Sequence, residues 1–318
     1  MTHIPLPTSP VSVNADVRVP GPSAEQPFHG WRVVGLSAVA LAATAPGQTA
    51  AISAFVDPMI SDLGISRSAM STAYLVGTLA GALAMPWFGR VLDRFGVRKA
   101  MAGVGLTFGA ILISLAAVTS VVGLTAGFVG VRMARQGALG LTATTAAALW
   151  FSRRRGTAVG LVGAIGASAI SLAPIALERL VADVGWRTTW VVEGLLVWAV
   201  VMPVAWLLRD RPSDVGQHVD GVAPGSDVED HTVWGVDRRR AMRTGFFWVV
   251  TAGVATSGML STAVAFHQIS LLGERGLSPT EAAANFLPQT VAALLATLAT
   301  GTLVDRASPR WITSASCW

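Results

Sequence analysis

The chain has 318 residues, of which 52% are hydrophobic and only 13% are charged. Soluble domains carry about 25% charged residues, so this composition excludes an ordinary water-soluble globular protein. The formal net charge of +5 at pH 7 comes from basic residues in short segments between apolar runs, which argues against nucleic acid as a partner. The only cysteine, Cys317, excludes an intrachain disulfide and offers no thiolate metal site.

The chain begins with a polar segment, residues 1–30, that is rich in Pro, Ser and Val and lacks an apolar core. It predicts a disordered cytoplasmic tail rather than a signal peptide. Long apolar runs follow, and a helix needs about 20 such residues to cross a bilayer. Residues 31–208 therefore predict an N-terminal bundle of six helices. The expected spans are 33–56, 69–88, 100–118, 122–150, 157–177 and 188–208.

The second part of the chain starts after a polar stretch, residues 209–243, which predicts a cytoplasmic linker. Residues 244–318 then predict a partial C-terminal bundle with spans at 245–268 and 282–303. The predicted fold class is an all-α integral membrane protein of about eight spans, each long enough for a bilayer.

The distribution of basic residues predicts the orientation. With the N-terminus in the cytoplasm, 17 of the 23 Lys and Arg residues fall in internal segments and only four in external loops. The two that remain, Arg132 and Arg135, lie inside a span. The positive-inside rule therefore predicts a multi-pass protein of the cell membrane with a cytoplasmic N-terminus.

One pattern occurs twice. Residues 89–99 read Gly-Arg-Val-Leu-Asp-Arg-Phe-Gly-Val-Arg-Lys, and residues 301–310 repeat the Gly, Asp-Arg and last Arg positions 212 residues later. The same offset pairs Gly64 with Gly276 and Ser66 with Ser278. Matching patterns at one offset indicate an internal duplication, which is how many secondary transporters are built.

Six spans, a polar central loop and the 89–99 pattern after the second span resemble the major facilitator superfamily. The resemblance implies two six-helix halves that rock against each other, with helices one, four and seven around a central cavity. Because twelve helices are usual in that family, the chain also resembles a C-terminally truncated member. The resemblance makes a gating loop of the following residues: Gly89, Asp93, Arg94, Gly96, Arg98 and Lys99, with Gly301, Asp305, Arg306 and Arg310 in the second copy.

Asp93 is the residue expected to act as a latch, because a carboxylate accepts strong hydrogen bonds from an Arg or a helix N-terminus. Gly89 lets helices approach closely at the end of the second span. The alternative interpretation is that residues 89–99 are only a basic turn that determines topology.

A finer resemblance concerns three loops. The segments 62–68, 150–158 and 185–187 are similar to those of bacterial members of the monocarboxylate-transporter-like branch. That resemblance implies transport of small organic anions, often together with protons.

Ionisable side chains inside spans are costly and usually functional. Arg132, Arg135 and Gln136 lie close to one face of the fourth span and resemble the Arg-containing motif of the family's fourth helix, although Gly137 falls one position late. Gln48 in the first span is expected at a similar depth, so a guanidinium beside it could bind a carboxylate bidentately. The alternative is that Arg132 only stabilises the bundle.

Two further residues are candidates for proton coupling. Glu193 lies in the sixth span and His267 near the outer end of the seventh. Either could carry a proton, or could be an interfacial residue that reaches water.

The sequence thus predicts a secondary active transporter, favoured for a small organic anion, with or without proton coupling. One alternative is efflux of hydrophobic compounds, although the Gly-Pro-x-x-Gly-Gly end of drug antiporters is absent where Ala173-Pro174 is followed by Ile175-Ala176. Another is a non-transporting membrane fragment. No phosphate loop, metal-ligand cluster or nucleophile-base arrangement occurs, so neither an enzyme nor a cofactor is expected.

Overall fold

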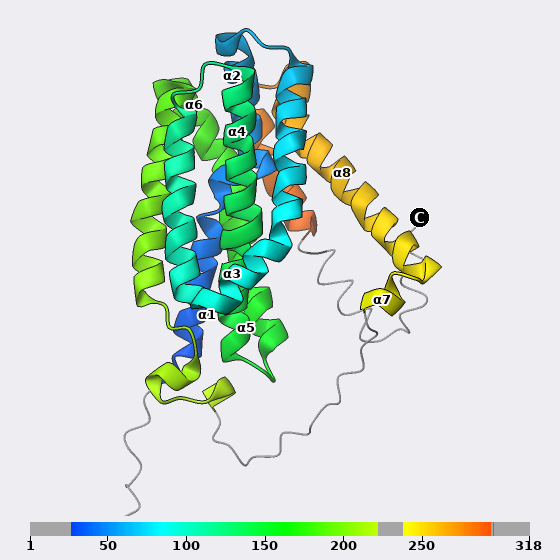
Figure 1. Ribbon diagram of the computed structural model, residues 1–318. Helices are drawn as coiled ribbons and strands as arrows, with labels where there is room; N and C mark the ends of the chain where they lie inside the picture. The colour runs from blue at the N-terminus through cyan, green and yellow to red at the C-terminus, as the bar shows by residue number, and fades with distance from the viewer. Residues whose placement is uncertain (1–26, 222–237, 294, 296–318) are drawn as a thin grey trace, which may run out of the picture.

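A computed structural model of the chain describes residues 27–221, 238–293 and 295. Every regular element within these ranges is helical, which agrees with the expected fold class. Long helices stand side by side in one bundle, and α8 leans away from it (Figure 1). Residues 1–26 and the second copy of the repeated loop at 301–310 lie outside the described ranges.

The first expected span, 33–56, was wrong as a single helix. It consists of α1 (Gly30–Ala42), a 3-10 turn η1 (Ala45–Gly47) and α2 (Thr49–Leu63). Pro46 lies in the turn and has no backbone N–H, so it cannot continue the hydrogen-bond ladder of α1. Gln48 is extended, with φ −72° and ψ 146°, and α2 starts directly after it. The break therefore has a local cause.

The next two spans form one helical element, α3 (Arg67–Leu115), with two arms joined at Gly96. Gly96 has φ 78° and ψ 167°, a conformation almost restricted to glycine. The fifth and sixth spans likewise form α6 (Arg155–Leu207), whose arms join at Gly185 with φ 79° and ψ 159°. Two glycines thus replace loops at opposite ends of the bundle.

The fourth span is continuous but irregular. It begins as α4 (Val121–Arg132), passes through a π-helix η2 (Met133–Leu139) and ends as α5 (Gly140–Trp150). A π-helix holds one extra residue in its turn. Gly137, which the sequence comparison found one position late, lies inside this segment.

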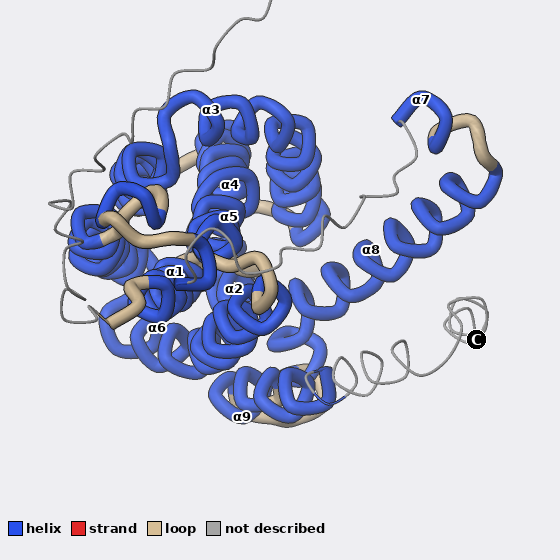
Figure 2. The backbone as a smooth tube through the Cα atoms, turned by 90° about the horizontal axis from the view of Figure 1, so that it is seen from below, coloured by secondary structure: helices blue, strands red, loops and turns tan. Residues whose placement is uncertain are grey.

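The segment after α6 contains two short turns, η3 (Pro212–Val215) and η4 (Val219–Gly221), and a short helix α7 (Arg238–Ala241). The seventh span is α8 (Gly245–Gly273), and the eighth begins with α9 (Pro279–Ala284). In Figure 2, α8 runs outward from the bundle, while α9 lies against it.

Two helix ends at paired positions of the repeat have the same backbone geometry. The N–H of Ile65 donates to the carbonyl of Ile60 at 3.3 Å, and the N–H of Leu277 donates to that of Leu272 at 3.2 Å. Gly64 and Gly276, which precede these donors, both have positive φ. Such a bond around a left-handed glycine is the Schellman helix end.

The helices that follow these glycines begin alike. The Ser66 hydroxyl accepts from the N–H of Ala69, and the Ser278 hydroxyl accepts from that of Glu281. The two positions, 212 residues apart, therefore share the same helix end and the same kind of cap.

The packed core lies inside the six-helix part, where Phe55 stacks on Trp190 with ring centres 4.1 Å apart. Within the described residues three helices, α3, α6 and α8, are long and apolar enough to cross a membrane. Their outward side chains are apolar and exposed, as for Leu83 at 83%. A surface of this kind suits hydrocarbon rather than water.

Candidate functional site

Arg132 is the centre of a buried polar cluster between α3 and α4. The residue is 3% exposed. Its Nη1 atom donates a hydrogen bond of 3.0 Å to the hydroxyl of Tyr74, and its guanidinium carbon lies 5.1 Å from the centre of the Tyr74 ring. Its Nε atom is buried without a hydrogen-bond partner among the described residues. The cluster therefore holds an incompletely satisfied cation.

Tyr74 connects this cation to two other helices. Its hydroxyl lies 2.7 Å from Oγ1 of Thr49, the first residue of α2. Its ring lies 4.5 Å from that of Phe266 on α8. The break in the first span therefore brings the N-terminus of α2 to the cluster, and Phe266 joins the cluster to the second part of the chain.

The other polar residues of this region have different neighbours. Nη1 of Arg135 donates to the carbonyl of Gly47 at 3.4 Å, and a Cβ at Gly47 would lie 2.7 Å from Cδ of Arg135. The side-chain amide of Gln48 donates to the hydroxyl of Thr44 at 3.2 Å, and its carbonyl oxygen accepts no hydrogen bond from Arg132. Gln136 belongs to the π-helix η2. The broken first span thus approaches both arginines through the Gly47 backbone and Thr49, whereas the sequence predicted this role for Gln48.

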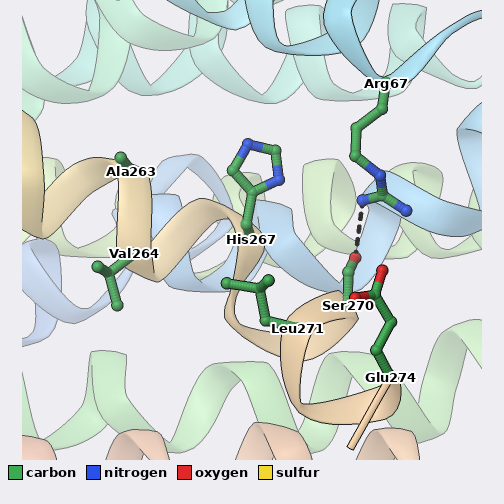
Figure 3. A pocket seen from close by; sticks show the side chains of 7 residues that line it. All are labelled: Arg67, Ala263, Val264, His267, Ser270, Leu271 and Glu274. Carbon is green, nitrogen blue, oxygen red and sulfur yellow. Dashed lines mark hydrogen bonds between the residues drawn. The ribbon is translucent and has the colours of Figure 1, made fainter.

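A second polar network lies where α8 meets the start of α3. Arg67 donates to Oδ1 of Asp57 at 2.6 Å and to the hydroxyl of Ser270 at 2.9 Å, and Ser270 donates to Oδ2 of Asp57 at 2.7 Å. Three elements, α2, α3 and α8, are joined by this triangle. Figure 3 shows the contact between Arg67 and Ser270.

His267 belongs to the same region. It lines a cavity of about 420 Å³ together with Arg67 and Ser270 (Figure 3). Its Nε2 atom lies 3.4 Å from the hydroxyl of Ser71. The histidine that the sequence singled out therefore lies beside a charged network that joins α8 to the N-terminal helices.

The predicted gating loop is described only in its first copy. Asp93, Arg94 and Lys99 are exposed, and Asp93 makes no hydrogen bond or ion pair in the described part of the chain. The loop is instead tied through its backbone, because the N–H of Arg98 donates to Oδ1 of Asp210 at 2.7 Å. A Cβ at Gly96 would lie 3.1 Å from Oδ2 of the same carboxylate.

Asp210 follows α6 and belongs to a set of contacts at one end of the bundle. The indole of Trp150 donates to the carbonyl of Arg209 at 3.3 Å. Asp220 accepts from the backbone N–H groups of Ser152 and Arg153 at 3.0 and 2.8 Å. Hydrogen bonds therefore join the start of the predicted linker, residues 209–220, to Arg98 and to residues 150–153 at this end of the bundle.

Glu193 lies apart from these clusters. It is 4% exposed, and its Oε2 atom is buried without a hydrogen-bond partner among the described residues. It lines a cavity of about 450 Å³ between the break in the first span and the two arms of α6. The interpretation of Glu193 as an interfacial residue that reaches water was wrong, because Trp190 and Val197, one turn away on either side, are also buried.

Tyr74, Asp57 and Asp210 were not among the residues that the sequence singled out. Tyr74 is the only tyrosine of the chain and lies inside an apolar run, which is a usable signal. Asp57 and Asp210 lie at span ends, where acidic residues are common, so only their long-range partners distinguish them. In the residues that the structure describes, no group of three or more His, Cys, Asp or Glu side chains could hold a metal ion.

Comparison with known proteins matches this architecture to one family. The model of the Major Facilitator Superfamily matches residues 37–317. None of the curated protein sequences compared with the chain matches it.

Two similar solved structures are of a bacterial homolog to the human lysosomal transporter Spinster, both inward-facing, one unoccupied and one occupied. Their TM-scores are 0.66 and 0.63, with 17% and 16% identity and 90% of this chain covered. The chain spans 64% and 63% of the length of those structures.

Proposed function

The chain belongs to the Major Facilitator Superfamily, a family of multi-pass membrane transporters rather than enzymes, and from this we propose that it serves secondary active transport of a small organic anion by alternating access. The favoured substrate class is a monocarboxylate, as the resemblance to the monocarboxylate-transporter-like branch suggests. The site that we propose for the carboxylate is Arg132. We place the protein in the cell membrane with its N-terminus in the cytoplasm.

The observation that carries the proposal is the buried and incompletely paired guanidinium. A cation inside a span is costly unless an anion or hydrogen-bond acceptors compensate it. Tyr74 occupies one nitrogen, Nη1, and the buried Nε has no partner in the described residues. Since a carboxylate accepts from two guanidinium nitrogens at once, an organic anion suits the remaining donors.

Other polar groups near Arg132 indicate that the proposed site could contact more of the substrate than its carboxylate. Arg135 adds a second cation one turn along the same span, and Gln48 and Thr49 offer uncharged hydrogen-bonding groups. We propose that these side chains orient the rest of a small polar substrate. The rings of Tyr74 and Phe266 are in contact, so a shift of Tyr74 on substrate binding would move Phe266 and with it α8.

Two contact sets suit the gates of alternating access. The triangle of Asp57, Arg67 and Ser270 joins α8 to the N-terminal helices on the side that we propose to be external. The loop around Gly96 and Asp93 is proposed as the internal gate, with its second copy at 301–310. His267 is the residue that we propose for proton coupling, because it adjoins the external triangle.

The test is uptake of short radiolabelled monocarboxylates by the purified 318-residue chain in liposomes, with and without an inward proton gradient. Saturable uptake that Arg132→Ala abolishes would support the proposal, and stimulation by the gradient would support coupling. Uptake of neutral hydrophobic compounds with no response to monocarboxylates would instead favour efflux of hydrophobic compounds.

A further inference from the structure

We propose that the cavity beside Glu193 is a binding site for an organic amine in its cationic form, with an apolar body of modest size. The cavity has a volume of about 450 Å³ and lies between the break in the first span and both arms of α6. This site goes beyond the proposed anion transport and does not depend on it.

The first argument is the carboxyl group itself. Glu193 is 4% exposed, and Oε2 has no hydrogen-bond partner in the described part of the chain. No Lys or Arg there lies within ion-pair distance of it, since the two ion pairs present use Asp57 and Asp62. Burying a carboxylate without a partner is strongly unfavourable, whereas a cationic ligand would supply the missing charge and donors.

The second argument is independent of Glu193 and comes from the opposite wall. Helix α1 ends at Ala42, and Ala42, Ala43 and Pro46 line the cavity. The C-terminal end of a helix carries a partial negative charge, so it favours a cation. Pro46 has no N–H, so it cannot donate to a carbonyl of the last turn of α1 as the next residue of a continuous helix would.

The remaining walls indicate what the rest of the ligand is. They are aliphatic side chains of the two arms of α6, among them Ala173, Leu177, Leu180 and Val197. An inorganic cation such as Ca²⁺ requires about six oxygen ligands, which these side chains do not provide. An ammonium group on an aromatic or aliphatic body satisfies both the polar end and the apolar walls.

The depth of the site distinguishes a free amine from a lipid headgroup. Glu193 lies eight residues from Gly185, where α6 turns back, which is about 12 Å along the helix at about 1.5 Å per residue. A phospholipid ammonium stays in the headgroup region, so we infer that the occupant is a free amphiphilic amine.

The site is also separate from the proposed anion site. Arg132 and Arg135 do not line the cavity, and neither makes a hydrogen bond to Glu193. Loss of amine binding and loss of anion uptake would therefore be distinguishable in one preparation.

The experiment is calorimetric titration of the purified 318-residue chain in nanodiscs of phosphatidylcholine and phosphatidylglycerol. The probes are 4-phenylbutylammonium, the neutral 4-phenylbutanol and the anionic 4-phenylbutyrate. We expect the ammonium probe to bind at least tenfold more tightly than the alcohol, and Glu193→Gln to remove this preference. The control is Glu178→Gln, because Glu178 lies on the same helix but outside the cavity.

A second variant keeps the test decisive if Glu193→Gln fails to fold. Ala176 lines the cavity and is exposed, so Ala176→Leu should fill the space without disturbing the core. It is expected to weaken both the ammonium and the alcohol probe while Glu193 is retained. Equal binding of the three probes, or unchanged ammonium binding in both variants, would overturn the proposal. Loss of binding in nanodiscs enriched in phosphatidylethanolamine would show a lipid headgroup as occupant and overturn the free amine.

Discussion

The backbone N–H of Arg98 donates a hydrogen bond of 2.7 Å to Oδ1 of Asp210, 112 residues away in sequence. One residue belongs to the loop between the second and third spans, and the other follows the sixth span. The bond therefore closes the N-terminal bundle at one end, and it uses a carboxylate outside the repeated pattern.

Asp210→Ala should destabilise the protein. It leaves the N–H of Arg98 without its acceptor in a partly buried position, which costs about 1–3 kcal/mol. Thermal unfolding of the protein in detergent measures the effect as a lowered Tm. Asp214→Ala is the control, because Asp214 is exposed and accepts only from the nearby N–H of Arg211. Equal Tm values for the two variants would contradict the structural role of Asp210.

Gly96→Ala should be more harmful than other glycine substitutions in α3. The residue has φ 78° and ψ 167°, which costs an L-residue about 1–3 kcal/mol, and its new Cβ would lie 3.1 Å from Asp210. Gly103→Ala is the matched control on the same helix, since nothing lies within 4 Å of its Cβ. Gly185→Ala separates backbone strain from the clash with Asp210, because Gly185 has a similar φ but no atom within 4 Å of its Cβ position. We expect Tm to fall most for Gly96, less for Gly185 and not at all for Gly103.

Elements that depend on local pattern could be predicted from the sequence, and contacts that depend on tertiary packing could not. Apolar length predicted helices in the regions of α3 to α6 and of α8, whereas the first span is broken at Pro46 and the eighth is described only as far as residue 295. Gly64 and Gly276, which the repeat pairs, both follow the end of a helix. The partners of Tyr74 and Asp210 are 58 and 112 residues distant, so no local pattern encodes them. Pro46 is the local cause of the break in the first span. The prediction of one helix over 33–56 rested on apolar length alone and did not take this proline into account.

Arg132→Lys should lower the affinity for a monocarboxylate at least tenfold, if Arg132 binds the carboxylate. A lysine keeps the charge but cannot offer two parallel N–H donors. Competition binding with a monocarboxylate and its amide analogue measures this, and the amide should be affected much less. Tyr74→Phe is the companion variant, because it retains the ring and removes only the hydroxyl that Arg132 contacts. The same loss for acid and amide would indicate a structural role.

The orientation predicts which cysteines a membrane-impermeant reagent reaches. In a Cys317→Ser background, Ser213→Cys should be labelled only after the cells are permeabilised, whereas Thr119→Cys should be labelled in intact cells. Both positions are exposed and lie at opposite ends of the bundle under the predicted topology. Labelling of position 213 from outside would reverse the assignment of the two faces.

Asp57→Asn should loosen the contact between α8 and the N-terminal helices. It removes the negative partner of Arg67, although the pair is 45% and 46% exposed and contributes at most about 1 kcal/mol to stability. The informative measurement is therefore accessibility: external labelling of Ser71→Cys, in the Cys317→Ser background, should rise several-fold.

Asp62→Asn is the control for this measurement. It breaks the other ion pair, with Arg187, and this pair does not involve α8. A similar rise in labelling for Asp62→Asn would show that the effect is general loosening rather than release of α8.

The π-helix at Met133–Leu139 affects how the fourth span must be compared with other proteins. Each residue of an α-helix turns the chain by about 100°, so one additional residue in a regular helix would rotate everything after it onto a different face. A π-helix accommodates one additional residue in its wide turn, so a helix can continue after it without that rotation. A comparison of the fourth span with a regular helix should therefore allow for one additional residue within Met133–Leu139.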